Sequence, residues 1–326
     1  MRRTSLALAL ALGLLVGCSR PVAPLPAASE RPVPAAPEPV TFPRDALPHD
    51  ALTEWWYFTG HLSNDYGFEF TVFQARREQA PSGYLAHFAL SDFKNQRFSH
   101  SIHVAQSPPA QDFPIQIGSW QLGASAFEAD MDDGSRLRLE VHDEYEKAPA
   151  LHNGGYIDLG PSGGSYYYSR TRLSVAGELN QTPVTGQAWM DHQWGNFVVA
   201  GPSGWDWYSL QLDDNTEVML YVLHSAPDAP FATYGSFVAA DGAVERLTSD
   251  DIVVEALDRW TSPHTGASYP SGWRMTVRGQ RLDIQPRMLD QELFSASPIY
   301  WEGAVSVSGD RTGRGYVELT GYAQDQ

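Results

Sequence analysis

The residues best suited to chemistry are the adjacent pair Asp191 and His192, which two tryptophans, Trp189 and Trp194, flank. A carboxyl group held among indole rings is desolvated, so its pKa rises and it can stay protonated as a general acid. Imidazole titrates near neutrality, so His192 could act as the base. Acid and base groups of this kind can add water to a carbon–carbon double bond, with aromatic faces stabilising the carbocation.

Two observations keep other roles open for these residues. Neighbouring residues of a strand point to opposite faces, so Asp191 and His192 share one cavity only if a bulge intervenes. Asp191 could instead be structural and bind backbone amides or Arg170, because buried charges are normally paired. Glu54 and Asp206 are further candidate acids, although for Glu54 a structural pairing with an arginine is favoured.

Aromatic residues gather around these polar groups. The chain contains ten tryptophans and fifteen tyrosines, which bury large areas and keep a polar end for a partner. They either pack the core or line an apolar cavity with few polar groups. The predicted ligand-binding residues are Trp55, Trp56, Tyr57, His87, Tyr167, Trp189, Trp194, Trp205 and Trp207.

The sequence does not favour a metal site, a cofactor site or a serine hydrolase. His61 and His87 could join His192 at a metal, but no HxH or HExxH spacing occurs, so we predict no metal site. Glycine-rich nucleotide motifs are missing too, and we predict no cofactor. Ser203, in Gly201-Pro202-Ser203-Gly204, lacks the strand–turn–helix context of a nucleophile elbow, which argues against a serine hydrolase.

Short alternating segments must position these side chains. Residues 68–73, 136–141, 172–175 and 304–308 alternate apolar with polar residues and are bounded by turn residues. This period of two is typical of half-buried antiparallel strands. The predicted fold class is therefore all-β.

The chain also resembles itself. Residues 168–177 align with residues 300–309 at a constant offset, and Trp56-Tyr57 parallels Trp207-Tyr208. The repeat predicts two lipocalin-like antiparallel β-barrel domains in tandem, since closing a sheet removes its edges. The predicted boundaries are 49–197 and 198–326. A pair of β-sandwiches is the alternative.

The first residues predict export and anchoring. Residues 1–17 have the form of a signal peptide, with two arginines, an apolar run and small residues before Cys18, the only cysteine. Cys18 is the predicted lipidation site, and the proline- and alanine-rich residues 18–48 form a tether. Ser19 favours the outer membrane over the inner one, on the periplasmic side. The net charge of −17 argues against nucleic-acid partners.

Seven motifs in order resemble the AttH and carotenoid 1,2-hydratase family. They are residues 54–60, 86–92, 166–170, 189–195, 204–207, 300–303 and 315–322. The resemblance implies two lipocalin-like domains. Many members are labelled "predicted secreted hydrolase", the hydratase branch adds water to a terminal double bond of acyclic carotenoids, and some bacterial members adjoin ABC-transporter genes.

Two functions of different class follow. In the first, the protein is a lipid-anchored periplasmic protein that binds an apolar, lipid- or isoprenoid-like molecule and serves an ABC-transporter permease. In the second, it is a hydratase or isomerase-type enzyme acting on an apolar polyene. The anchor favours binding, and the aromatic-flanked Asp191 and His192 favour catalysis.

Overall fold

Two antiparallel sheets make up most of the computed structural model, and the alternating segments are strands, which confirms the all-β prediction. The structure describes residues 37–76, 82–108, 110–158, 163–197, 204–227 and 230–323. The N-terminal sheet contains β1 (Thr53–Leu62), β2 (Tyr66–Ala75), β3 (Ser82–Asp92), β4 (Arg97–Ser107), β5 (Ile115–Ile117), β6 (Trp120–Leu122), β7 (Ala126–Asp130), β8 (Arg136–His142), β9 (Ala150–Asp158), β10 (Gly163–Leu179) and β11 (Thr182–Phe197). The C-terminal sheet contains β12 (Gly204–Leu212), β13 (Glu217–His224), β14 (Pro230–Val238), β15 (Val244–Leu247), β16 (Ile252–Thr261), β17 (Ser268–Val277), β18 (Gln280–Pro286), β19 (Glu292–Leu293), β20 (Tyr300–Gly309) and β21 (Gly313–Thr320).

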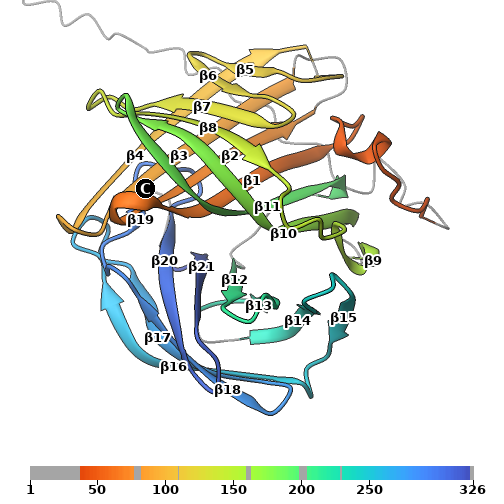
Figure 1. The fold of residues 1–326 in the computed structure, drawn as a ribbon, viewed down its shortest axis with the longest axis vertical. Coiled ribbons are helices and arrows are strands. Elements are labelled where there is room, and N and C mark those ends of the chain that lie inside the picture. The colour runs from red at the N-terminus through yellow and green to blue at the C-terminus, as the bar shows by residue number, and fades with distance from the viewer. Residues whose placement is uncertain are drawn as a thin grey trace, which may run out of the picture.

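The two sheets share one topology (Figure 1). The N-terminal sheet runs β4-β3-β2-β1-β11-β10-β8-β7-β6-β5, and the C-terminal sheet runs β15-β14-β13-β12-β21-β20-β18-β17-β16. In each sheet one further strand, β9 or β19, pairs with β10 or β20. Tyr168–Gly177 lies in β10 and Tyr300–Gly309 is β20, so the repeated segments occupy equivalent strands, as the repeat predicts.

The sheets curl to different extents. The end strands β4 and β5 of the N-terminal sheet contact each other without pairing, so this sheet is a near-barrel. In the C-terminal sheet the end strands β15 and β16 do not pair over the described residues, and the sheet is a half-barrel. Each sheet wraps its own apolar core, with Trp56 and Phe70 in the first and Tyr208 and Trp273 in the second.

A β-bulge in β10 changes which residues of the repeat correspond. Between Arg170 and Leu173 the register of β10 against β11 shifts. Because side chains alternate, an extra residue reverses the face to which every preceding side chain points. Tyr168 therefore packs inside its barrel, whereas Tyr300 packs outside the core of its own sheet. The constant offset therefore aligns equivalent strands, but the side chains of the two aligned tyrosines point to opposite faces of their sheets.

The predicted match of Trp56 with Trp207 is also wrong by one residue. Trp56 lies in the core of the N-terminal barrel. Trp207 lies on the face of the C-terminal sheet opposite to the core of that sheet, and it packs against Tyr57. Leu62 and Leu212 each end their strand and point into their cores, and counting back from them pairs Tyr57 with Trp207. The sequence repeat therefore aligns two tryptophans whose side chains point to opposite faces of their sheets.

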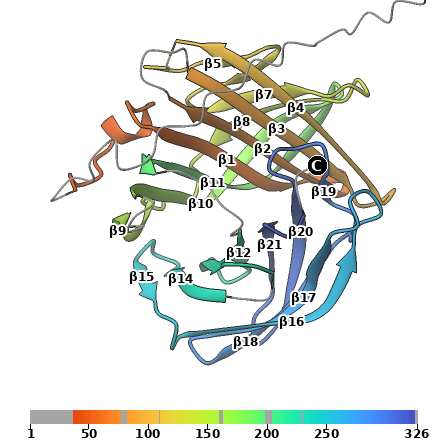
Figure 2. The ribbon, with the colours of Figure 1, turned by 180° about the vertical axis from the view of Figure 1, so that it is seen from behind.

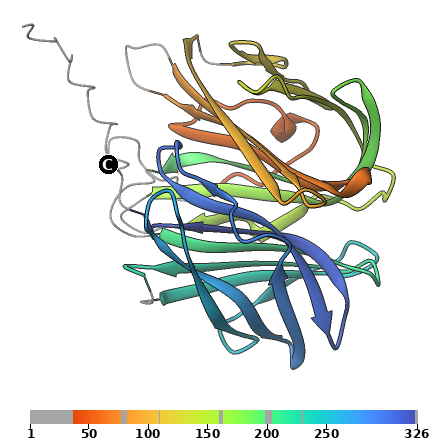
Figure 3. The same cartoon turned by 90° about the vertical axis from the view of Figure 1, so that its left-hand side faces the viewer.

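One face of the N-terminal sheet packs against one face of the C-terminal sheet (Figures 1 and 3). At one side of this contact Glu217 of β13 is buried and binds two cations of the N-terminal half, Lys147 Nζ at 2.8 Å and Arg172 Nε at 2.7 Å. Gln211 Nε2 donates to the carbonyl oxygen of Thr171 at 2.8 Å. Because a buried charge is costly without its partner, these bonds fix the orientation of the sheets. Seen from behind, β19 and β20 lie against β3 and β4 (Figure 2).

The segment before β1 crosses one end of the N-terminal barrel. It contains the 3-10 turn η2 (Arg44–Ala46), and a second turn, η3 (Ser63–Asp65), joins β1 to β2. Val40 packs on the barrel core, and the Phe42 ring meets Tyr168 edge-on at 4.9 Å. The predicted signal peptide, Cys18 and most of the tether lie outside the described residues. Within the described part of the chain, no helix is both long and apolar enough to cross a membrane.

Candidate active site between the two sheets

A row of polar side chains crosses the face of the N-terminal sheet that meets the C-terminal sheet. Paired positions on β10, β11, β1, β2 and β3 carry Ser169, Asp191, Tyr57, Thr71 and His87 in that order. All five are buried, because the second sheet covers a face that alternation alone would assign to solvent. Directly opposed side chains are close neighbours, so the row is a continuous polar band.

The C-terminal sheet supplies a facing row. Glu302 of β20, Glu318 of β21, Trp207 of β12 and Tyr221 of β13 are paired in that order. The hydroxyl of Tyr57 donates to Glu302 Oε1 at 2.9 Å and joins the two rows. We call the side chains between the sheets the shared layer. Its buried apolar and aromatic part comprises Tyr57, Phe93, Tyr167, Trp189, Trp207, Met219, Met288, Ala304 and Tyr316.

Asp191 is surrounded by hydrogen-bond donors. Tyr167 donates to Oδ2 at 2.6 Å, while Trp189 Nε1, at 2.6 Å, and the Ser169 hydroxyl donate to Oδ1. From the other sheet, Trp207 Nε1 donates to the Tyr167 hydroxyl at 3.2 Å. Burial raises the pKa of Asp191 to about 6, and the three donors limit the rise because they favour the carboxylate. Asp191 is therefore mostly ionised at neutral pH.

His152 links Asp191 to the C-terminal sheet. Its Nε2 lies 2.6 Å from Ser169 Oγ, and its Nδ1 lies 2.9 Å from Ser236 Oγ on β14. Burial lowers the pKa of His152 to about 3, so the ring is neutral. Because Ser169 donates to Asp191, its oxygen is free to accept from His152, and Ser236 donates to the other ring nitrogen. A chain of hydrogen bonds thus runs from β14 to the carboxylate.

Three glutamates of the shared layer are held protonated. Burial raises the pKa of Glu69 and of Glu318 to about 8, and that of Glu302 well above its usual range. Glu302 and Glu318 stand directly opposite each other on paired strands, where two like charges repel strongly. A carboxyl group that stays neutral at pH 7 in an apolar site can serve as a general acid.

Several buried polar atoms of the shared layer have no hydrogen-bond partner. Among the described residues they include Glu69 Oε2, Glu302 Oε2 and His87 Nε2. Native structures leave few buried polar atoms unsatisfied, so such exceptions call for an explanation. His87 and Glu302 are each oriented through their other atom, by Tyr300 at 2.8 Å and Tyr57 at 2.9 Å. Each keeps one polar atom available to a bound molecule.

The shared layer is not uniformly closed. Trp205, Tyr221 and Glu318 remain partly exposed, unlike the fully buried Glu302 and Tyr300. The rings of Trp205 and Tyr221 lie 6.1 Å apart. These side chains therefore mark the part of the layer nearest to solvent.

His192 points into the N-terminal barrel, away from Asp191. The ladder between β1 and β11 is regular throughout, so no bulge brings the two residues together, and strand alternation places them on opposite faces. His192 Nε2 lies 2.8 Å from Glu54 Oε1, and Glu54 Oε1 lies 2.7 Å from His49 Nδ1. The expectation that Glu54 pairs with an arginine is wrong, because its carboxylate contacts two histidines.

Other candidate residues also have partners that differ from expectation. Arg170 pairs with Asp143 at 2.7 Å instead of Asp191. Asp206 lies in the C-terminal half, where it accepts a hydrogen bond from Tyr322 at 2.9 Å. His61 faces the shared layer, with Nε2 3.1 Å from the carbonyl oxygen of Gly315. His61 and His87 are thus on the opposite face of the sheet from His192, and the three do not form one site.

The predicted ligand-binding residues divide between two places. Trp56 and Trp194 lie inside the barrel around His192, with ring centres 4.9 and 4.7 Å from the imidazole. The others face the shared layer: Trp55, Tyr57, His87, Tyr167, Trp189, Trp205 and Trp207. The aromatic residues therefore surround two separate polar groups, one around His192 and one around Asp191.

Sequence reasoning missed Glu69, Glu302 and Glu318. Each occupies the polar position of an alternating strand, which normally faces water. A signal was present, because Phe68 and Phe70 flank Glu69, and Tyr300 and Trp301 directly precede Glu302. His49 was missed because it lies outside every strand and motif.

Comparison with known protein families identifies the family of the chain. The model of the family described as AttH-like matches residues 33–322. The chain belongs to the AttH-like family. No curated protein shows a significant match to it.

Solved structures extend the comparison. The AttH-like chain superposes on the crystal structure of an AttH protein from Nitrosomonas europaea with a TM-score of 0.81 and 30% identity, covering 89% of this chain and 99% of that one. Kievitone hydratase from Nectria haematococca matches with a TM-score of 0.68 and 16% identity, covering 86% and 92%. CghA matches with a TM-score of 0.51 and 12% identity, covering 85% and 90%. At these identities the last two show the fold alone.

Proposed function

We propose that this AttH-like protein is a hydratase that adds water to, or removes it from, an apolar alkene bound in the shared layer. The observation that carries the proposal is Glu302, a buried protonated acid with one free oxygen amid aromatic rings. The similarity to kievitone hydratase supports a hydratase over other acid-catalysed reactions. The aromatic walls favour an isoprenoid or polyene substrate.

The roles of general acid and general base follow from the different pKa values that the surroundings give to Glu302 and Asp191. Glu302, protonated, transfers its proton to one alkene carbon, and the carbocation forms at the other carbon beside aromatic faces. Water attacks the cation, and the mostly ionised Asp191 takes the proton that the water loses. Tyr57 stands between the two groups, paired with Asp191 across β1 and β11 and donating to Glu302. Proton exchange with solvent through the partly exposed Glu318 restores the starting state.

The test is turnover of an acyclic carotenoid in ¹⁸O-labelled water, followed by mass spectrometry. We expect a labelled hydroxyl group in the product. Glu302→Gln keeps the shape and the acceptor for Tyr57 but removes the proton, so the rate should fall by about 10²–10⁴-fold.

Glu292→Gln is the matched control, since Glu292 is a buried glutamate of the same sheet that binds Ser262, Thr265 and Tyr269 instead. It should leave the rate within about threefold of wild type. Equal rates in wild type and Glu302→Gln would refute the assignment.

We also propose that the protein is lipid-anchored at Cys18 on the periplasmic side of the envelope, with the outer membrane favoured. The signal-like residues 1–17 and the proline-rich tether support this. An anchor of this kind would hold the enzyme beside the bilayer in which an apolar substrate dissolves.

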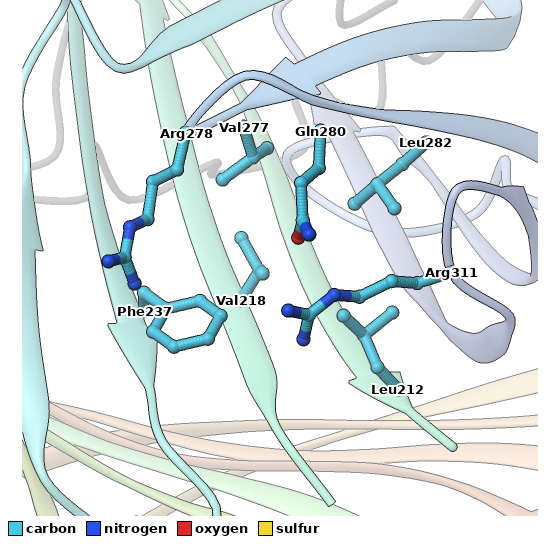
Figure 4. A pocket seen from close by; sticks show the side chains of 8 residues that line it. All are labelled: Leu212, Val218, Phe237, Val277, Arg278, Gln280, Leu282 and Arg311. Carbon is cyan, nitrogen blue, oxygen red and sulfur yellow. The ribbon is translucent and has the colours of Figure 1, made fainter. Parts of the chain in front are cut away.

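Binding of an amphipathic molecule is a second candidate function, favoured by a cavity at one end of the C-terminal half-barrel (Figure 4). Its volume is about 190 Å³, and apolar side chains such as Val218 and Leu282 line it. Arg278 and Arg311 lie over the Phe237 ring, with guanidinium carbons 4.7 and 5.9 Å from its centre. An acyl chain in the cavity would bring a carboxylate to these cations. Such a carrier could deliver cargo to an ABC-transporter permease.

Binding of decanoate, measured by calorimetry, tests the carrier role. Double replacement of Arg278 and Arg311 by glutamine should weaken binding by about tenfold or more, because charged hydrogen bonds contribute about 1.5–3 kcal/mol each. Equal affinity in the variant and the wild type would exclude this cavity as the carboxylate site.

A further inference from the structure

Three metal-ligating side chains meet inside the N-terminal barrel, on the face of β11 opposite to Asp191. They are His49, from the segment before β1, Glu54 of β1 and His192 of β11, and one ligand atom of each lies within 4.8 Å of the others. His49 Nδ1 and His192 Nε2 lie 2.7 and 2.8 Å from Glu54 Oε1. Glu54 and His192 are fully buried, and His49 is 18% exposed by its side chain, so solvent reaches the group only past His49.

The far nitrogen of each imidazole already has a partner. His49 Nε2 lies 3.4 Å from Asp45 Oδ1, and His192 Nδ1 lies 3.2 Å from the Tyr168 hydroxyl. Histidines that bind metal commonly donate their other N–H to a carboxylate, a carbonyl group or water, which fixes the tautomer and directs the lone pair to the metal. Here Asp45 and Tyr168 can accept those two N–H groups, which leaves His49 Nδ1 and His192 Nε2 as ligands.

The distances fit a first-row divalent metal after a small adjustment. Tetrahedral coordination at about 2.0–2.2 Å places ligand atoms about 3.4 Å apart. The ligand nitrogens of the two histidines must therefore each move about 0.6 Å away from Glu54 Oε1. For the partly exposed His49, rotation of the side chain can provide this movement. Two histidines and one carboxylate leave at least one position for water or a ligand.

A cavity adjoins this group. It has a volume of about 210 Å³, and His49, Trp194, Tyr166 and Asn196 are among its lining residues. The His49 ring stacks on Trp194, with centres 4.0 Å apart and planes 2° from parallel. His49 therefore belongs both to the cavity wall and to the polar group behind it.

We infer that His49, Glu54 and His192 form a site for a first-row divalent metal ion at the end of the N-terminal barrel. The site lies apart from the shared layer, so it goes beyond the proposed hydratase function and can fail without affecting it. Because His49 precedes β1, the metal would also tie the segment that follows the predicted tether to the barrel wall.

Cobalt provides the direct test, because Co²⁺ bound by nitrogen and oxygen ligands absorbs visible light. Protein carrying no histidine tag is stripped with EDTA, titrated with Co²⁺ and competed with Zn²⁺. We expect one Co²⁺ per chain, a visible absorption band, displacement by Zn²⁺ and a Tm higher by about 5 °C at saturation. Binding should weaken at acid pH, because the histidines must be neutral to bind.

Variants separate a metal site from a hydrogen-bond network. His49→Ala should weaken Co²⁺ binding by at least about 100-fold, and Asp45→Asn by about tenfold, because outer partners orient the ligand ring. His103→Ala is the control, since His103 stacks on Trp120 in the same barrel and should leave affinity unchanged. Circular dichroism of each metal-free variant verifies folding. Absence of a 1:1 complex, or equal affinity in wild type and His49→Ala, would overturn the inference.

Discussion

Replacing Glu69 by glutamine should stabilise the protein, and more so as the pH rises. Glu69 is 1% exposed in the shared layer, where burial raises its pKa from 4.5 to about 8. The unfolded chain loses this proton near pH 4.5, but the folded protein retains it up to about pH 8. The stability contributed by the protonated group is therefore complete below the lower value and is lost as the pH rises through the window.

The magnitude follows from the proton difference. One proton held only by the folded state lowers the free energy of unfolding by about 1.4 kcal/mol for each pH unit. Between about pH 5 and pH 8 the wild type should lose about 4 kcal/mol relative to Glu69→Gln, with little screening at so buried a site. The glutamine oxygen still accepts the hydrogen bond from Thr71.

Urea unfolding of both proteins across this pH range provides the measurement. The difference in free energy should be small at about pH 5 and should grow with a slope of about 1.4 kcal/mol per pH unit. Thr276→Val, on the partly exposed face of β17, serves as a control. Its free energy of unfolding should depend on pH in the same way as that of the wild type. Parallel curves for wild type and Glu69→Gln would show that Glu69 ionises in the folded state and would refute the reasoning.

Three further predictions concern other parts of the molecule. Asp191→Asn places an amide where three donors converge, so the free energy of unfolding should fall by about 1–3 kcal/mol in a denaturation experiment. Lys147→Met removes one cation from buried Glu217 and should cost up to about 3–5 kcal/mol in the same assay; a loss below about 0.5 kcal/mol would mean that Arg172 alone suffices. Cys18→Ser should abolish incorporation of labelled palmitate in cells, and continued labelling would contradict the anchor.

Period-two alternation was sufficient to predict the strands, because it reports directly on which side of a strand is buried. It also separated Asp191 from His192 correctly. It failed at Tyr168, where a bulge reverses the facing, since the extra residue leaves no mark in the local composition.

The glutamates of the shared layer illustrate a deeper limit. Glu69 and Glu302 satisfy the alternation of their own strands, and a single isolated sheet would expose both. Their burial arises only when the second sheet covers the first, which is a property of tertiary packing. The partners of Glu54 were missed for a similar reason, because His49 reaches it from an irregular segment.

The facing acids of the shared layer also have a consequence for how the two halves associate. Considered as two binding partners that the chain holds at high local concentration, the sheets bring Glu302 and Glu318 out of water as they meet. Both must gain protons that they would lack in separate halves, so the association consumes acid. Its equilibrium constant should fall by about tenfold per proton for each pH unit above the carboxyl pKa of the open form. Alkaline solution would thus weaken the association of the two halves while leaving each apolar core intact.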